Sequence, residues 1–194
     1  MIFLYYQDGK CNLDCVIHSK LLYYIFEPPF SGGFFRRKMK YRQLSKEQFL
    51  ALHKEFAQFL ATQQIDNDEW ETINKEKPEM ADEELNIFSY VVWEKVLTKT
   101  KYLEHISENH INLFKCNSTE IDRIYIRLND TKRNFLHAQD YGWFLNNLRD
   151  DTVEYFSASK KYAKERNLEI FDLIEMGSQI SKGVLYNTII ELIR

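Results

Sequence analysis

The chain has 194 residues, of which 44% are hydrophobic and 28% are charged, and its formal net charge is −3. These are the proportions of a globular protein that forms its core without disulfides or metal ions. A mild negative charge argues against a protein that binds by neutralising many phosphates, because such a protein carries a basic face. There is also no run of about 18 apolar residues that could span a membrane, so we expect no membrane partner.

The start of the chain does not resemble an export signal. A secretory signal has a basic stretch before its apolar segment, whereas this chain begins MIFLYYQDG, and the best later apolar run, Leu21–Phe26, is too short. The three cysteines are not spaced as a disulfide framework. We therefore expect a cytoplasmic protein.

Residues 1–38 differ in composition from the remainder. They hold nine of the 29 aromatic residues, two of the three prolines, three of the six glycines, and both Cys11 and Cys15, without regular periodicity. Without them the chain has 21 basic and 26 acidic residues, a net charge of −5. We interpret residues 1–38 as a mis-called upstream extension, or alternatively a disordered arm, and residues 39–194 as a single α+β domain. An intact N-terminus at Met1 in the natively expressed protein would contradict the first interpretation.

The first clear helix signal follows Leu44. Ser45 can cap a helix, Gln48 stands at the reciprocal capping-box position, and Leu44 and Phe49 are placed as a hydrophobic staple. Apolar residues continue at helical spacing as far as Gln63. The pattern predicts one amphipathic helix.

Two further helices are predicted before the middle of the chain. Asp66 can cap the first, with Glu69 three residues later, and Pro78 ends it. The second covers about residues 81–97. Acidic residues are concentrated over 66–84, which we interpret as helix N-terminal turns and solvated faces, because the spacing is not that of an EF-hand.

The middle of the chain changes to the alternation of a β-strand. Within Ile121–Leu128, aliphatic residues alternate with Arg123, Tyr125 and Arg127, which predicts a half-buried strand. Residues 111–116 form a candidate partner strand, and the residues between the two are typical of a turn. Residues 102–106 are either a third strand or the end of a helix.

Helical spacing returns in the last third. It predicts a helix around residues 141–148, a second helix capped by Asp151 or Thr152 that runs to about Arg166, and a third that ends at Gly177. A last helix covers about 185–192. The fold class is therefore α+β, mostly helical, with a small antiparallel β-hairpin or three-stranded sheet between N-terminal and C-terminal helices.

Three segments carry a resemblance to a known family. They are MKYRQLSKEQFLALHKEFAQFLATQQID (Met39–Asp66), EELNIFSYVVWEKVLTKTKYLEH (Glu83–His105) and KERNLEIFDLIEMG (Lys164–Gly177). Together they resemble a family of small uncharacterised bacterial proteins, a domain of unknown function found mainly in Bacteroidota. The resemblance covers residues 39–194 and none of 1–38. It implies a cytoplasmic bacterial protein and implies no activity, cofactor or catalytic residue.

Four residues near the predicted hairpin are capable of binding a metal: His105, Glu108, His110 and Cys116. Their spacing is not that of a zinc helix, which has two histidines one turn apart. In an extended segment, histidines five residues apart point to opposite faces. We therefore favour surface histidines and a core cysteine, and we expect no bound metal or cofactor.

Basic residues provide the second chemical signal. A strand that displays Arg123, Tyr125 and Arg127 on one face can stack a base and hold phosphates. Further basic residues follow at Lys160, Lys161, Lys164 and Arg166. The alternative is a solvated surface, which the acidic character of the whole domain favours.

We therefore expect a non-enzymatic interaction or regulatory protein with a protein partner, because the sequence has no recognisable catalytic motif. The alternative is a nucleic-acid- or ribosome-associated factor that binds RNA through the basic residues. A metal-dependent enzyme is the second alternative. The sequence gives no indication of the oligomeric state.

Overall fold

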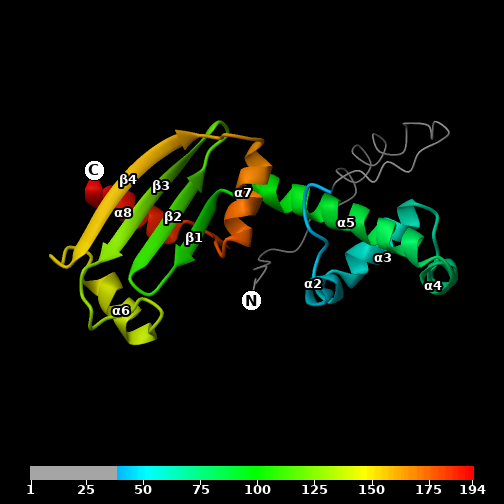
Figure 1. Cartoon of the computed structure of the whole chain (residues 1–194), viewed down its shortest axis with the longest axis horizontal. Coiled ribbons are helices and arrows are strands. Elements are labelled where there is room, and N and C mark those ends of the chain that lie inside the picture. The colour runs from blue at the N-terminus through cyan, green and yellow to red at the C-terminus, as the bar shows by residue number, and fades with distance from the viewer. Residues whose placement is uncertain (1–38) are drawn as a thin grey trace. The chain divides into compact units, whose positions relative to one another are not determined.

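The computed structural model describes residues 39–194, which divide into two compact units (Figure 1). The first unit extends to Lys95 and the second begins at Val96. We call residues 39–95 the helical unit and residues 96–194 the sheet unit. The interpretation of residues 1–38 concerns a part of the chain outside the described residues. Within residues 39–194, no helix is both long enough and apolar enough to cross a membrane.

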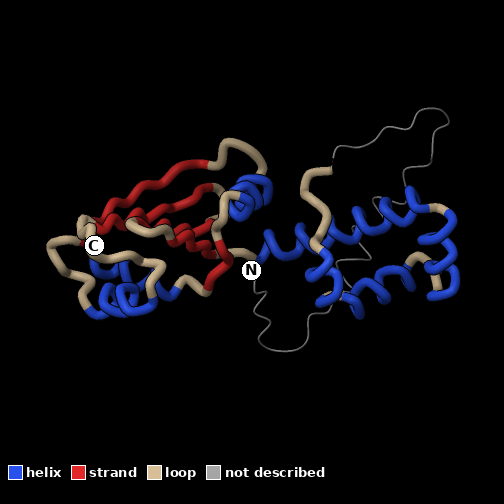
Figure 2. The backbone as a smooth tube through the Cα atoms, turned by 60° about the horizontal axis from the view of Figure 1, so that its bottom comes forward, coloured by secondary structure: helices blue, strands red, loops and turns tan. Residues whose placement is uncertain are grey.

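Helices α2 to α5 make up the helical unit (Figure 2). Their bounds are Lys46–Ala51 for α2, His53–Thr62 for α3, Asn67–Glu76 for α4 and Pro78–Lys99 for α5, whose last residues belong to the sheet unit. The predicted capping box is confirmed, because Ser45 accepts from the Gln48 amide and the Gln48 side chain accepts from the Ser45 amide. Asp66 caps α4 as predicted.

The prediction of one helix from Ser45 to Gln63 is wrong in one respect. The backbone leaves the helical conformation at Leu52, with φ −110° and ψ 21°, so α2 and α3 are separate helices. The His53 ring hydrogen-bonds the Leu50 carbonyl at this break, with 3.0 Å between Nδ1 and the oxygen. The break places Phe49 and Phe56 against Phe88 of α5, with ring centroids 5.9 and 5.1 Å away.

The sheet unit contains five strands in the order β4-β3-β2-β1-β5, all antiparallel. Their bounds are Tyr102–Ile106 for β1, His110–Cys116 for β2, Glu120–Leu128 for β3, Val153–Lys161 for β4 and Gln179–Ser181 for β5. The predicted hairpin is therefore β2–β3, and residues 102–106 form a strand. The α+β class is confirmed, but the sheet is larger than the hairpin or three strands that we predict from the sequence.

The predicted helix from Asp151 or Thr152 to Arg166 is wrong, because strand β4 occupies this segment. The turn before it is built by Asp150, whose carboxylate accepts from the Thr152 amide at 3.0 Å. This local bond starts an extended strand instead of capping a helix. Along β4, Val153 then pairs with Leu128 and Tyr155 with Ile126. Pairing with β3, a tertiary interaction, outweighs the local pattern.

Three helices accompany the sheet: α6 (Ala138–Asn146), α7 (Arg166–Glu175) and α8 (Val184–Ile193). All three agree with the predicted helices, and α7 ends before Gly177, which has φ 99°. The core of the unit joins one face of the sheet to α6 and α8; its buried members include Ile111, Leu113, Ile124, Ile126, Phe144, Leu185 and Ile189. Gly183 precedes α8 with φ 74°, and a Cβ there would lie 2.4 Å from the Tyr102 ring, so only glycine allows this approach.

Candidate functional site

The second face of the sheet is open over much of its area. In Figure 1, α8 passes behind the strands, and α7 lies over one end of the side facing the viewer. Asn112 lies opposite His105 on β1 and opposite Tyr125 on β3, and Tyr125 lies opposite Phe156 on β4. Directly opposed residues of antiparallel strands point to the same face. We call this surface the open face; its members are His105, His110, Asn112, Arg123, Tyr125, Arg127, Glu154 and Phe156.

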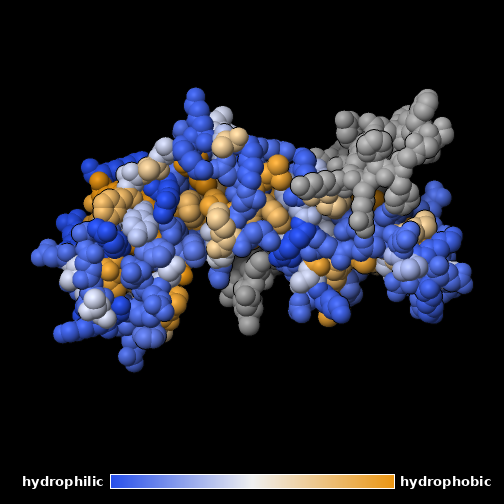
Figure 3. Space-filling model, viewed as in Figure 1, coloured by the Kyte–Doolittle hydropathy of each residue, from blue (hydrophilic) through white to orange (hydrophobic). Residues whose placement is uncertain are grey.

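Four rings cross the open face in a continuous row. The centroid distances are 6.4 Å from His105 to His110, 5.6 Å from His110 to Tyr125 and 6.0 Å from Tyr125 to Phe156. We call these four residues the aromatic row. Phe156 is 48% exposed, and Figure 3 shows apolar side chains among polar ones over these strands. The other three rings are half-buried. A row of partly exposed planar groups suits a planar partner, because aromatic rings gain energy by stacking.

The last two rings of the row, Tyr125 and Phe156, each have an arginine beside them. The Arg123 guanidinium carbon is 5.3 Å from the centroid of the Tyr125 ring, and the Arg127 carbon is 5.5 Å from that of Phe156. Cation–π contacts of this kind hold the guanidinium group close to the ring. The open face therefore carries two neighbouring ring-and-cation pairs, Tyr125 with Arg123 and Phe156 with Arg127.

Hydrogen bonds orient both guanidinium groups. Arg123 Nε donates to Asn112 Oδ1 at 2.9 Å, and Asn112 is buried. Arg127 Nε donates to Glu154 Oε2 at 2.9 Å, and this bond is the main cause that lowers the pKa of Glu154. The partner of Arg123 is a neutral amide, so its charge is available to an anion, whereas the charge of Arg127 is partly offset.

His110 lies in the centre of the row. Burial lowers the pKa of His110 below its usual value, and the neighbouring His105 and Arg123 lower it further. The ring is therefore neutral near pH 7. A neutral ring stacks with an uncharged planar partner without the cost of removing water from a cation.

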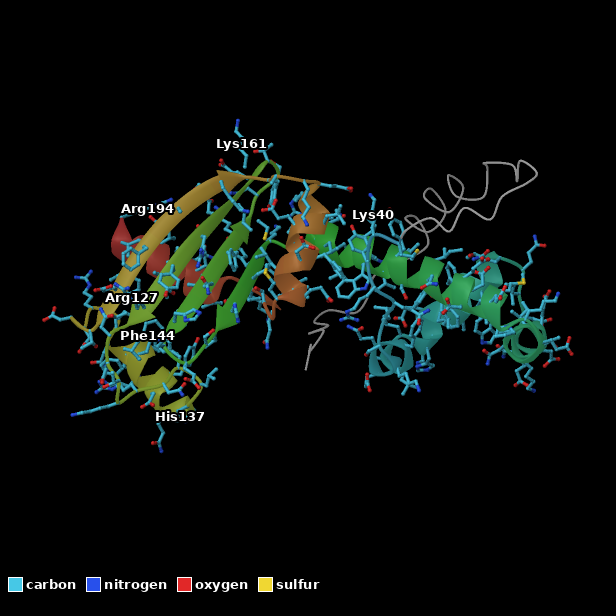
Figure 4. All side chains as sticks on the ribbon, in the orientation of Figure 1. Lys40, Arg127, His137, Phe144, Lys161 and Arg194 are labelled. Atoms are coloured by element: carbon cyan, nitrogen blue, oxygen red, sulfur yellow. The ribbon has the colours of Figure 1, made fainter. Side chains whose placement is uncertain are left out.

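Of the other four basic residues predicted from the sequence, Lys160 lies on the same side of the sheet as the open face, but none of the four joins the row of rings. Lys160 pairs with Glu169, and Lys164 pairs with Asp172. Lys161 pairs with Glu120, so it lies on the face of β4 opposite to Phe156, and it lies at the far end of the β3–β4 pair from Arg127 (Figure 4). The structure therefore groups Arg123, Tyr125 and Arg127, whereas Lys160, Lys164 and Arg166 are held in other contacts and Lys161 lies on the other face.

Arg166 lies among backbone carbonyls. Its guanidinium donates to the carbonyl oxygens of Leu97, Thr100, Cys116 and Asn117, at distances between 2.6 and 3.0 Å. These carbonyls come from the end of α5, the segment after it, and the β2–β3 turn. Arg166 thus joins three backbone segments of the sheet unit, which is a structural role.

The candidate metal ligands are only partly brought together. The chain reverses between His105 and His110, where the Ser107 amide donates to the His110 carbonyl at 2.9 Å. The two histidines therefore belong to different strands and share one face, so the prediction that they point to opposite faces is wrong. Glu108 is exposed in the turn and Cys116 is buried at the far end of β2. Residues 39–194 contain no group of three His, Cys, Asp or Glu side chains placed to hold a metal.

The net negative charge of residues 39–194 comes from one of the two units. The helical unit contains seven basic and 12 acidic residues, whereas the sheet unit contains 14 of each. The net charge of −5 over residues 39–194 therefore belongs to the helical unit. The sheet unit is neutral, so its net charge does not repel nucleic acid.

Three members of the open face are not predicted from the sequence. Phe156 and Glu154 are missed because residues 151–166 are assigned to a helix, and Asn112 is missed because a lone asparagine in a strand has no distinctive pattern. A signal for β4 does exist. Val153 and Tyr155 alternate with Glu154, and such an alternation in β-prone residues after a turn indicates a strand.

Comparison with known proteins shows one match. The model of a family described as "Family of unknown function (DUF6495)" matches residues 39–194. The chain belongs to this family. No curated protein and no solved structure matches the chain. The family match confirms the predicted resemblance of residues 39–194 to a domain of unknown function.

Proposed function

We propose that this protein is a non-enzymatic binding protein of the bacterial cytoplasm whose sheet unit binds single-stranded RNA on the open face. The observation that carries the proposal is the aromatic row with Arg123 and Arg127 beside its rings. Of the two kinds of partner expected from the sequence, protein and RNA, the open face favours RNA.

The spacing of the row supports this choice. Neighbouring strands lie about 4.8 Å apart, so rings on adjacent strands reach successive unstacked bases of an extended strand. Stacking of one base on one aromatic side chain contributes roughly 1–3 kcal/mol and depends little on the sequence of the nucleic acid. The Arg123 and Arg127 guanidinium groups supply positive charge for the phosphates between those bases.

The same geometry disfavours double-stranded nucleic acid. A duplex keeps its bases stacked on one another, so their planar faces are not available to protein rings. Affinity for a duplex would depend on many phosphate contacts. The sheet unit has equal numbers of acidic and basic residues, so we expect weak duplex binding.

Titration of a fluorescently labelled ten-nucleotide RNA of mixed sequence tests the proposal by anisotropy at low salt. We expect saturable binding by the full chain and much weaker binding to the same sequence in a duplex. Tyr125→Ala and Phe156→Ala should each weaken binding roughly tenfold, the loss of one stacking contact.

The matched control is Ser157→Ala, which changes the residue next to Phe156 on the opposite side of β4. We expect it to bind as the unchanged protein does. Equal affinity of the Phe156→Ala and Ser157→Ala variants, or no binding of RNA at low salt, would overturn the proposal.

A further inference from the structure

Two adjoining cavities lie on the helix-covered side of the sheet unit, at the edge formed by β1 and β5. Their volumes are about 500 and 430 Å³. Glu104, Tyr141 and Ser181 line both cavities, so the two form one continuous groove. We call it the edge groove. It lies on the opposite side of the sheet from the aromatic row, because Glu104 pairs with Leu113, a core residue of the helix-covered face.

Part of the rim of the edge groove is aliphatic and exposed, beside polar lining residues that include Lys182, Thr188 and Gln179. Val184 and Leu145 line one cavity, and Leu136 lines the other. Val184 is 70% exposed, Leu136 59% and Leu145 45%. Aliphatic side chains gathered around a hollow are typical of a protein-binding surface, whereas scattered ones are not.

The carboxylate of Glu104 lines the groove beside these aliphatic side chains. The side chain of Glu104 makes no hydrogen bond or ion pair with any residue of the described chain. Burial is the main cause that raises the pKa of Tyr141, and the negative charge of Glu104 raises it further. An unpaired carboxylate between aliphatic walls is complementary to a cation that is flanked by apolar groups.

The third feature is a free strand edge. β5 is the last strand of the sheet, and among the described residues it pairs only with β1. Its residues Gln179, Ile180 and Ser181 line the groove. An extended peptide can add to such an edge through its backbone, while alternate side chains enter pockets beside it.

We propose that the edge groove binds an extended segment of a partner protein in which a lysine or arginine is flanked at alternate positions by aliphatic residues. The basic side chain pairs with Glu104, and the aliphatic side chains pack against Val184 and Leu145 on one side and Leu136 on the other. Alternate positions are required because side chains of an extended segment point to one side at every second residue. This inference is independent of RNA binding.

Anisotropy of a labelled peptide with the centre Leu-Ser-Lys-Ser-Leu, titrated with the full chain, tests the inference. We expect saturable binding and at least about fivefold weaker binding when glutamate replaces the lysine of the peptide, as for loss of a partly exposed ion pair. This comparison requires no change in the protein. Glu104→Gln should reduce the preference, and Glu104→Lys should reverse it in favour of the glutamate peptide. The control Glu120→Gln changes an exposed carboxylate of β3 and should leave the preference unchanged.

Hydrogen exchange provides the second measurement. Binding of the lysine peptide should slow exchange of backbone amides within residues 179–182. The inference is wrong if the lysine peptide does not bind, if the Glu104 variants keep the original preference, or if exchange at 179–182 is unchanged. A dimer in sedimentation velocity that Val184→Lys dissociates would also overturn it, because a second copy would then occupy the groove.

Discussion

Tyr125 and Phe156 lie directly opposite each other on β3 and β4, with their ring centroids 6.0 Å apart. The guanidinium group of Arg123 lies beside the Tyr125 ring, and that of Arg127 lies beside the Phe156 ring. The pair therefore forms two ring-and-cation units at the spacing of adjacent strands. Under the RNA-binding proposal each of these units contacts one of two successive nucleotides, and the pair forms only because β4 is a strand.

Replacement of Glu154 by glutamine should strengthen RNA binding. Glu154 is ionised at neutral pH, since its hydrogen bond with Arg127 lowers its pKa, and it is the one carboxylate among the defined members of the open face. Its removal frees Arg127 for a phosphate. We expect affinity to rise about three- to tenfold at low salt and less at high salt.

The control for that variant is Asp151→Asn, which changes the net charge equally but lies in the turn before β4. Anisotropy titrations of both variants with the same RNA separate a local effect from a general one. An equal gain for the two variants would mean that total charge, and not the open face, determines affinity.

The sequence predicts part of this site for a clear physical reason. Alternation over Ile121–Leu128 determines which side chains share a face, so Arg123, Tyr125 and Arg127 are grouped correctly. The helical caps at Ser45 and Asp66 are equally local, and they are also correct. Interactions of this kind depend on neighbours within a few residues, which the sequence displays directly.

The missed features depend on distant partners. Strand β4 exists because residues 153–161 pair with β3, about 30 residues earlier in the chain, and local spacing does not report such pairing. The same holds for Arg166, which appears in the sequence as one member of a basic cluster. Its four carbonyl partners come from segments between Leu97 and Asn117.

Arg166→Ala should destabilise the protein strongly. The substitution leaves four backbone carbonyls without their charged donor. We expect the free energy of unfolding to fall by about 2–4 kcal/mol, because hydrogen bonds to charged groups are worth more than neutral ones. Urea denaturation measures this change.

The comparison for Arg166 is Lys164→Ala, which removes an exposed ion pair with Asp172. An exposed pair contributes under about 1 kcal/mol. If the two variants lost similar stability, the structural role assigned to Arg166 would be wrong.

Acidification should reduce stability partly through His110. The pKa of His110 in the folded protein lies below its usual value of 6.5. As the pH falls through about 6.5, the unfolded chain therefore binds a proton more readily than the folded one, and stability falls until the pH is below the folded pKa. His110→Gln should lose less stability than the unchanged protein between about pH 7.5 and about pH 5.5. Urea midpoints at both pH values measure this difference, and an identical decline in the two proteins would count against it.

Cys116 should be unreactive in the folded chain. Burial raises the pKa of its thiol to about 11, and the side chain is buried at the end of β2. The thiolate, which is the reactive form, is therefore scarce at neutral pH. We expect alkylation by N-ethylmaleimide to be at least about 100-fold slower in the native protein than in urea. Mass spectrometry of the peptide that contains Cys116 follows the reaction, and rapid native labelling would show that the thiol is accessible.

The most direct test of RNA binding is a map of the bound surface by NMR. Backbone and side-chain shifts of the isotopically labelled full chain are recorded as a ten-nucleotide single-stranded RNA is added. We expect the largest shifts on open-face residues of β1 to β4, with the ring signals of Tyr125 and Phe156 among them. Shifts centred on residues 160–166, or no shifts at low salt, would contradict this expectation.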